Sequence, residues 1–203
     1  MFHDASRAPT AGAVIPIRAF ALGKARLAAS LDGPERAELA RRWAEQVATA
    51  AAPMPVVVVS SDPDVRAWAG ALHLDVLDDP GTLDTAVTAG RDHLRACGCS
   101  RVVVAHADLP HARDLARLAR DGSQPVVALV PCHRDDGTPV LSVPATADFR
   151  FAYGPGSFRR HTAEARRLGL GLRVVRDHEL AFDVDVPADL AALETSLQAS
   201  TSP

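Results

Sequence analysis

The segment Arg101–Pro110, RVVVAHADLP, constrains the fold of this chain more than any other stretch. Its apolar residues 102–105 do not alternate with polar ones, so a strand formed here must be covered on both faces, as in the centre of a parallel sheet. Pro110 ends the strand, and a helix is predicted over roughly 112–120. Asp108 then stands at the carboxyl end of a central strand, where open α/β sheets bind ligands. The alternative interpretation is that Asp108 caps the following helix.

Apolar runs and helical patterns alternate along the rest of the chain. Further strands are predicted at 13–17, 56–59, 74–77, 125–130 and 172–175, and helices at about 32–52, 62–71, 82–96 and 158–168. This alternation predicts a single-domain α/β fold, a doubly wound and mostly parallel sheet with helices on both faces. We expect the domain to span 13–197, after an N-terminal extension (1–12) and before a loose C-terminal tail (198–203).

Composition narrows the functional class. A chain of 203 residues with 47% hydrophobic and 23% charged residues can bury one substantial core. A net charge of -3 argues against a broad nucleic-acid or anionic-membrane surface. No apolar run approaches the roughly 20 residues that span a bilayer, and the first residues lack a signal-peptide pattern. We therefore expect a cytoplasmic protein that binds neither nucleic acid nor membrane. The spacing of Cys97 and Cys99, near His93, is not that of a usual zinc site.

A basic loop follows the first predicted strand and contains Arg18, Lys24 and Arg26. Its position places it on the ligand side of a parallel sheet. A guanidinium fork and a compact ammonium both suit phosphate groups, so these residues are candidates for phosphate binding. The loop matches neither a Walker A motif nor a GxGxxG fingerprint, and a solvated basic loop is the alternative interpretation.

Regular patterning fails between Cys132 and Arg160, and a long irregular segment in a compact domain is more often functional than accidental. Within it, Gly154-Pro155-Gly156-Ser157 precedes a helical run. We expect Ser157 to be the N-cap, and the first amides of that helix to be available to an anion.

Two carboxylates near the end of the chain, Asp183 and Asp185, are spaced so that an extended segment places them on one face. Together with Asp108 they offer an oxygen-ligand set that suits Mg²⁺. The sequence thus predicts a magnesium site assembled from two distant parts of the chain.

Read together and in this order, the segments PIRAFALGKARL, DDPGTLDTAV, HADLP, DDGTPVL, FAYGPGSFRRH and FDVDVPADL resemble the guanylyltransferases of coenzyme F-420 biosynthesis. That family has a nucleotide-diphospho-sugar transferase-like fold and transfers GMP from GTP to phosphoenolpyruvate or 2-phospho-L-lactate, releasing pyrophosphate. The resemblance implies residues in four roles: Lys24, Arg26 and Asp108 in catalysis; Arg18, Lys24, Arg26 and Asp84 at the nucleotide; Thr138, Gly154, Gly156 and Ser157 at the phosphorylated acid; and Asp108, Asp183 and Asp185 at Mg²⁺. For His161, which follows the GPGSF motif, a purely helix-stabilising role is equally consistent.

Two positions depart from the family pattern, because Pro139 and Asp84 stand where the family usually has asparagine. They leave open a related nucleotidyltransferase that uses another phosphorylated acid, such as 3-phosphoglycerate, or another base. A non-catalytic nucleotide-binding protein is the alternative from a different class. The sequence does not fix the oligomeric state, and a homodimer remains open.

Overall fold

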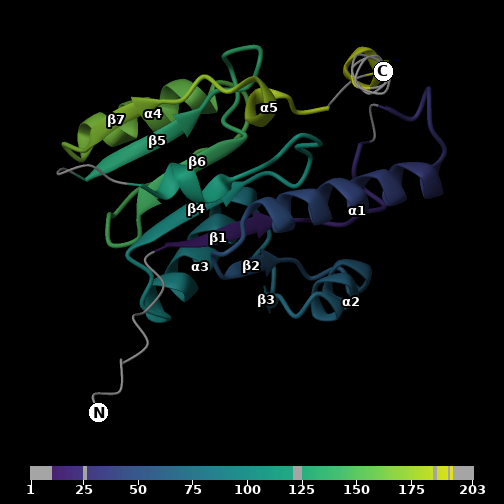
Figure 1. The fold of residues 1–203 in the computed structure, drawn as a ribbon, viewed down its shortest axis with the longest axis horizontal. Helices are drawn as coiled ribbons and strands as arrows, with labels where there is room; N and C mark the ends of the chain where they lie inside the picture. The colour runs from purple at the N-terminus through teal and green to yellow at the C-terminus, as the bar shows by residue number, and fades with distance from the viewer. Residues whose placement is uncertain (1–10, 25–26, 121–124, 185–186, 192, 194–203) are drawn as a thin grey trace, which may run out of the picture.

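The computed structural model describes residues 11–24, 27–120, 125–184, 187–191 and 193. Within them, a seven-stranded sheet has the order β3-β2-β1-β4-β6-β5-β7 (Figure 1). Its strands are β1 (Ala11–Pro16), β2 (Val56–Val59), β3 (Asp75–Leu77), β4 (Arg101–Ala105), β5 (Val126–Val130), β6 (Val140–Pro144) and β7 (Gly171–Val174). The helices are α1 (Gly33–Ala50), α2 (Pro63–Ala71), α3 (Leu83–Ala96), the 3-10 helix η2 (Leu115–Ala119), α4 (Ser157–Arg167) and α5 (His178–Ala181).

The sheet is mostly parallel, as predicted, but one strand runs against the others. β1 pairs in parallel with β2 and β4, β2 with β3, and β5 with β7. β6 is antiparallel to both β4 and β5. It lies inside the segment that we expected to be irregular, so that expectation was wrong for 140–144. The central strand β4 is buried along its whole length, as its apolar run predicts, although one of its two neighbours is antiparallel.

Alternate residues of the strands form two apolar layers, one on each face of the sheet. On one face, Ile15 and Val103 pack in a core with residues of α1, α2, η2 and α5. On the other face, Val14 and Val104 pack with α3, α4 and the aromatic residues Phe149 and Phe151. Helices therefore cover both faces, as a doubly wound sheet requires (Figure 1).

Two local predictions differ from the structure. The helix expected over 112–120 is instead the short 3-10 helix η2, preceded by Asp114 in the left-handed conformation (φ 43°). A left-handed residue cannot continue an α-helix, so the regular helix does not form. The first strand is Ala11–Pro16, so it begins two residues earlier and ends one residue earlier than the predicted 13–17.

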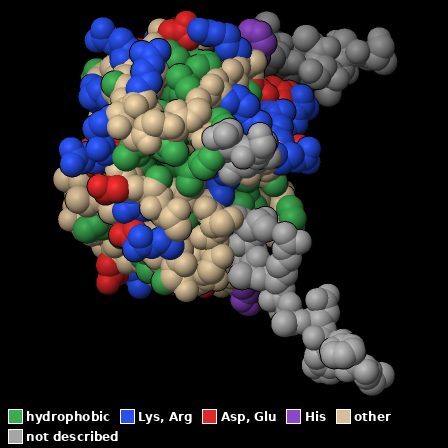
Figure 2. Space-filling view, turned by 90° about the vertical axis from the view of Figure 1, so that its left-hand side faces the viewer, with side chains coloured by type: hydrophobic (Ala, Val, Ile, Leu, Met, Phe, Trp, Pro, Cys, Tyr) green, Lys and Arg blue, Asp and Glu red, His purple; other side chains and the backbone are tan. Residues whose placement is uncertain are grey.

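The four strands β3, β2, β1 and β4 are mutually parallel neighbours, so their carboxyl ends lie along one edge of the sheet. The loops after them are brought together there, although they are far apart in sequence. Figure 2 views the side of the molecule at which β1 begins, where basic side chains surround areas of apolar ones and acidic groups are interspersed. Among the described residues, the helices are too short or too polar to cross a membrane.

Candidate active site

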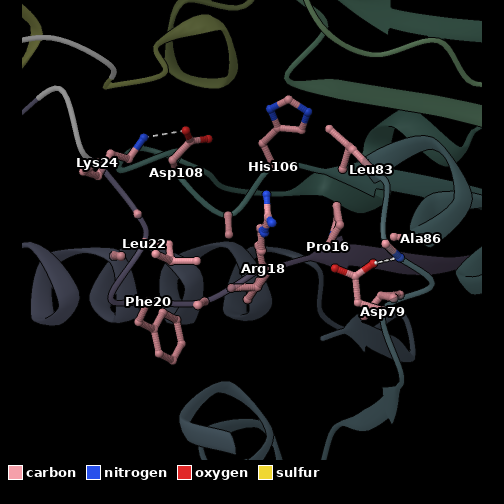
Figure 3. Close-up of a pocket in the computed structure, with 17 residues that line it drawn as sticks. Pro16, Arg18, Phe20, Leu22, Lys24, Asp79, Leu83, Ala86, His106 and Asp108 are labelled. Carbon is pink, nitrogen blue, oxygen red and sulfur yellow. Dashed lines mark hydrogen bonds and ion pairs between the residues drawn. The ribbon is translucent and has the colours of Figure 1, made fainter. Parts of the chain in front are cut away.

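A cavity of about 790 Å³ opens at the carboxyl ends of these parallel strands (Figure 3). Its lining comes from the segment after β1 (residues 16–20 and 22–24), from Val59 at the end of β2, from Asp79, Gly81, Leu83 and Ala86, and from residues 106–108 after β4. The cavity lies at the edge where sheets of this class bind ligands. Its volume is in the range of small-molecule and cofactor sites.

An ion pair lies at one end of the cavity, between Lys24 and Asp108. Lys24 Nζ donates a hydrogen bond to Asp108 Oδ2 at 2.5 Å, and the two side chains are 7% and 25% exposed. Burial alone would raise the pKa of Asp108, but the Lys24 ammonium and the nearby His106 outweigh it and hold that pKa below its usual value. The other carboxylate oxygen, Oδ1, is buried and has no hydrogen-bond partner in the described part of the chain.

The same geometry decides between the two interpretations of Asp108. The residue that precedes η2 is Asp114, so Asp108 does not act as a helix cap. It faces the cavity instead, as predicted for a carboxylate at the end of a central strand.

Arg18 also lines the cavity, with an exposed side chain that extends toward its centre (Figure 3). Of the predicted basic loop, Arg18 and Lys24 are therefore on the cavity wall; the Lys24 side chain is buried against Asp108, whereas Arg18 is exposed to solvent. Phosphate binding by these residues stays a prediction. Arg26 lies outside the described residues.

Thr138 and Ser157, both predicted from the irregular segment, lie together in a second group with His161. Ser157 Oγ donates to Thr138 Oγ1 at 3.3 Å, and His161 Nδ1 lies 3.1 Å from the same hydroxyl oxygen. All three residues are buried. This group does not line the cavity, so the structure keeps the two sets of predicted residues apart.

The hydrogen bonds assign the tautomer of His161. The backbone N–H of Ala152 donates to His161 Nε2 at 3.0 Å, so the ring proton must be on Nδ1 and is donated to Thr138. Burial, with smaller contributions from Arg160 and His106, lowers the pKa of His161 to about 4. The ring is therefore neutral near pH 7 and acts as a fixed link between 152 and Thr138.

The start of α4 differs from the prediction. Gly156, not Ser157, is the N-cap residue, and no side chain of its own caps the helix. Asp136 accepts the hydrogen bonds from the start of this helix instead. Its carboxylate accepts from Gly156 N at 2.9 Å, and its backbone carbonyl accepts from Phe158 N at 3.0 Å. Ser157 N donates to the Gly154 carbonyl. The amides of Ser157 and Phe158 are therefore already bonded within the protein, contrary to the expectation that the first amides of this helix are available to an anion.

The two glycines of the GPGS motif adopt left-handed backbone conformations, with φ of 94° at Gly154 and 75° at Gly156. L-residues with a Cβ rarely adopt them, which explains the two glycines that flank Pro155. Arg160 holds the resulting turn, since its guanidinium donates to the carbonyls of Ala152, Tyr153, Gly154 and Pro155.

Asp84 has a partner that the sequence did not indicate. One carboxylate oxygen accepts from the backbone N–H of Tyr153 at 2.7 Å, so Asp84 fastens α3 to the segment before the GPGS turn. Burial, and secondarily the Asp84 charge, raise the pKa of Tyr153, whose phenol stays protonated.

His106 and Tyr153 lie between the cavity and the buried Thr138 group. His106 lines the cavity, its ring centroid is 5.3 Å from that of Tyr153, and Tyr153 is 4.8 Å from His161. Both His106 Nε2 and Tyr153 Oη are buried without a hydrogen-bond partner among the residues described.

Sequence reasoning found His106 only as a neighbour of Asp108 and did not single out Tyr153, Asp136 or Arg160. The one available signal was their place within the motifs HADLP, DDGTPVL and FAYGPGSFRRH.

The predicted magnesium ligands are only partly described. Asp183 Oδ1 lies 3.2 Å from His133 Nδ1, and Asp185 is outside the described residues. In the described ranges, no group of three or more His, Cys, Asp and Glu side chains is arranged to hold a metal ion. Carboxylate oxygens suit Mg²⁺, and the unpartnered Oδ1 of Asp108 is consistent with a cation there. The three-aspartate set stays a prediction.

The fold is that of nucleotide-diphospho-sugar transferase-like proteins. A solved nucleotide-diphospho-sugar transferase from Desulfovibrio desulfuricans G20 superposes with a TM-score of 0.78 at 16% identity, covering 95% of this chain and 90% of that one. At the level of sequence, residues 11–198 match the family model described as guanylyl transferase, CofC like. The chain belongs to this guanylyltransferase family.

Relatives with more specific names align over most of the chain. A phosphoenolpyruvate guanylyltransferase of Sphaerobacter thermophilus is 37% identical over 188 residues, 89% of this chain and 91% of the relative. A 2-phospho-L-lactate guanylyltransferase of Halorubrum lacusprofundi is 36% identical over 177 residues, 84% of this chain and 78% of the relative. The family resemblance carried by the sequence motifs is thereby confirmed.

Proposed function

We propose that this protein transfers GMP from GTP to the phosphate of phosphoenolpyruvate or 2-phospho-L-lactate, a step of coenzyme F-420 biosynthesis. The observation that carries the proposal is the buried Lys24–Asp108 pair at the end of a nucleotide-sized cavity, in a chain of the guanylyltransferase family. A buried cation at the carboxyl ends of parallel strands suits a triphosphate.

In the proposed reaction, a phosphate oxygen of the acid attacks the α-phosphorus of GTP in line. A new P–O bond forms, the bond from the α-phosphorus to the bridging oxygen breaks, and that oxygen leaves with pyrophosphate. A phosphate monoester is mostly dianionic at neutral pH, since its second pKa is about 6, so the attacking oxygen needs no general base.

The protein's part is then positioning and charge neutralisation. Lys24 and Arg18 face the cavity and would bind the phosphates, with Arg26 as the third predicted cation. Asp108, Asp183 and Asp185 would hold Mg²⁺, which when bound neutralises phosphate charge. The Lys24 ammonium keeps Asp108 ionised and therefore able to accept a cation.

We assign the acid to the region of Thr138, Gly154, Gly156 and Ser157. This assignment is supported by the family motif and by the ring contacts of Tyr153, which packs against His106 of the cavity and against His161 beside Thr138. Because His161 Nδ1–H and Ser157 Oγ–H both donate to Thr138, the hydroxyl proton of Thr138 is used in neither bond, although the residue is 1% exposed. An acid that reaches this hydroxyl would have its phosphate on the side of His106.

The setting of the reaction is also a proposal. We expect the enzyme to act in the cytoplasm on these two small substrates, without nucleic acid or membrane. A homodimer is testable by analytical ultracentrifugation of the purified chain.

The deciding experiment measures pyrophosphate release with Mg²⁺. GTP is compared with ATP, CTP and UTP, and phosphoenolpyruvate with 2-phospho-L-lactate and 3-phosphoglycerate. Release that requires GTP and one of the first two acids supports the proposal, and EDTA should abolish it. Preference for 3-phosphoglycerate would move the protein to another pathway. Tight GTP binding without release would indicate a non-catalytic nucleotide-binding protein.

Asp108→Ala and Asp183→Ala should abolish pyrophosphate release without loss of fold, which circular dichroism can check. Rates near those of the wild type in either variant would remove that residue from the magnesium set.

A further inference from the structure

The end of the cavity away from Lys24 contains a carboxylate, Asp79, that has not been given a role above. It follows β3 and lies across the cavity from the Lys24–Asp108 pair (Figure 3). Two hydrogen bonds fix it: Asp79 N donates to Ser61 Oγ at 2.9 Å, and Gly81 N donates to Asp79 Oδ1 at 2.8 Å. The second carboxylate oxygen points into the cavity (Figure 3).

The walls beside Asp79 are apolar. Pro16, Val59, Leu83 and Ala86 line this end, and Leu83 is 38% exposed although it is a large hydrophobic side chain. An exposed leucine at a cavity wall offers a surface for a flat, weakly hydrated group. The cavity is thus polarised, with Lys24 at one end, Arg18 extending toward the centre, and an apolar slot that ends in a carboxylate at the other end.

This polarity matches the two ends of a nucleoside triphosphate. If Lys24 contacts phosphates, the base lies toward Asp79. We propose that Asp79 reads the base, its carboxylate accepting hydrogen bonds from N1–H and the 2-amino group of guanine. The inference rests on the proposed function, because it takes the nucleotide of that reaction and assigns the residue that selects it.

Hydrogen-bond chemistry makes a carboxylate selective for guanine. A carboxylate only accepts, and guanine presents two adjacent donors on its Watson–Crick edge. Adenine and cytosine present a ring nitrogen acceptor in the middle of that edge, and uracil flanks its one donor with two carbonyls. Each of these places an acceptor against the carboxylate, which costs binding free energy.

Neighbouring carboxylates are not equivalent to Asp79. Asp84 already accepts from Tyr153 N. Asp78 does not line the cavity, its side chain is 86% exposed, and it pairs with Arg66. Asp78 therefore provides a matched control, one position away and with the same charge.

The test is Asp79→Asn, with Asp78→Asn beside it. Asparagine keeps an oxygen that can accept from Gly81 N, so the turn is preserved, while an NH₂ donor replaces the oxygen that faces the cavity. We expect kcat/KM for GTP to fall by about 10- to 100-fold, the loss of one or two charged hydrogen bonds. XTP, whose 2-oxo group accepts where guanine donates, should become a substrate as good as GTP or better. Asp78→Asn should retain the wild-type preference.

The same assay compares GTP with two further nucleotides, ITP and dGTP. ITP lacks the 2-amino group, so the wild type should prefer GTP to ITP by about tenfold or more and Asp79→Asn should lose that preference. An equal fall for GTP, ITP and XTP in Asp79→Asn would overturn the proposal. So would a change confined to the GTP-to-dGTP ratio, which would place Asp79 at the ribose.

Calorimetric titration with GTP and XTP separates this inference from the proposed function. A wild type that binds GTP but releases no pyrophosphate with any acid would refute the proposed reaction. The shift of Asp79→Asn toward XTP in binding would still support the base-reading role, and its absence would refute that role alone.

Discussion

Lys24 Nζ lies 2.5 Å from Asp108 Oδ2, although the two residues are 84 positions apart. The pairing follows from the sheet, because β1 and β4 are parallel neighbours and the segments after them meet at the same edge. Lys24 reaches Asp108 from a left-handed backbone conformation, φ 58°, which costs a non-glycine residue about 1 kcal/mol or more. Its ammonium also lies 5.5 Å from the ring centroid of Trp43 on α1. Several contacts thus hold one cation at the cavity.

Replacing Lys24 by Met should abolish pyrophosphate release and destabilise the fold. Asp108 would lose its buried counter-charge, and an unpaired carboxylate in this position costs about 1–3 kcal/mol. Urea unfolding measures the stability, and Arg42→Met, which removes an exposed charge from α1, is the control. Wild-type turnover in Lys24→Met would show that the pair is only structural.

Thr138→Val keeps the shape of the side chain and removes its hydroxyl. Two buried donors, His161 Nδ1–H and Ser157 Oγ–H, would lose their acceptor, so we expect a loss of about 2–4 kcal/mol in unfolding free energy. If the acid binds at this hydroxyl, Thr138→Ser should retain activity, while a folded Thr138→Val should show a higher KM for the acid and an unchanged KM for GTP. An unchanged KM for the acid in Thr138→Val would place the acid elsewhere.

The sequence predicted most of the fold because its strands and caps are locally determined. The apolar runs at 56–59 and 101–105 coincide with β2 and β4, and the helix predicted from about 32 begins with Asp32 and Glu35 in a reciprocal capping box. These are short-range signals that need no tertiary context. These signals are enough to predict the parallel strands of the sheet and the edge at which their carboxyl ends lie.

The predictions that were wrong concern elements whose hydrogen-bond partners are distant in the sequence. β6 was missed because its residues, VLSVP, lie among glycines and prolines, and its hydrogen bonds come from β4 and β5. Likewise, Asp136 caps α4 from twenty positions earlier. No local pattern identifies such a cap, whereas Ser157 had the local signature of one.

Some residues of the candidate site could be predicted from the sequence, and others required the three-dimensional structure. Lys24, Asp108 and Arg18 follow strands and could be placed at a shared edge from topology alone. Asp79 and Asp84 lie in one motif, and only the three-dimensional structure shows that the first lines the cavity while the second bonds to Tyr153. Sequence proximity did not distinguish the two carboxylates.

His161→Gln should change how stability depends on pH. The pKa of His161 is about 4 in the folded protein, against about 6.5 when unfolded. Between these values the unfolded chain binds a proton that the native protein does not, so stability falls as the pH falls from about 6.5 to 4, by up to about 3 kcal/mol. The variant should be less stable near pH 7 and lose less stability across that window. His178→Gln, at an exposed site, should retain the wild-type slope in urea titrations, and an equal slope in His161→Gln would contradict the buried neutral ring.

Arg160→Met should loosen the GPGS turn without unfolding the domain. The guanidinium donates to four consecutive carbonyls, 152–155, and these are near enough to solvent that water can replace it, so the global cost should be about 1–2 kcal/mol. Hydrogen exchange should accelerate at the amides of 152–157 and remain unchanged in β4. If this turn positions the acid, KM for the acid should rise several-fold while KM for GTP does not, because the cavity residues are untouched. Arg159→Met, the exposed neighbour on the same helix, removes the same charge and should change neither measurement. Equal effects of the two variants would mean that the positive charge of α4, rather than the hydrogen bonds of Arg160, is what matters.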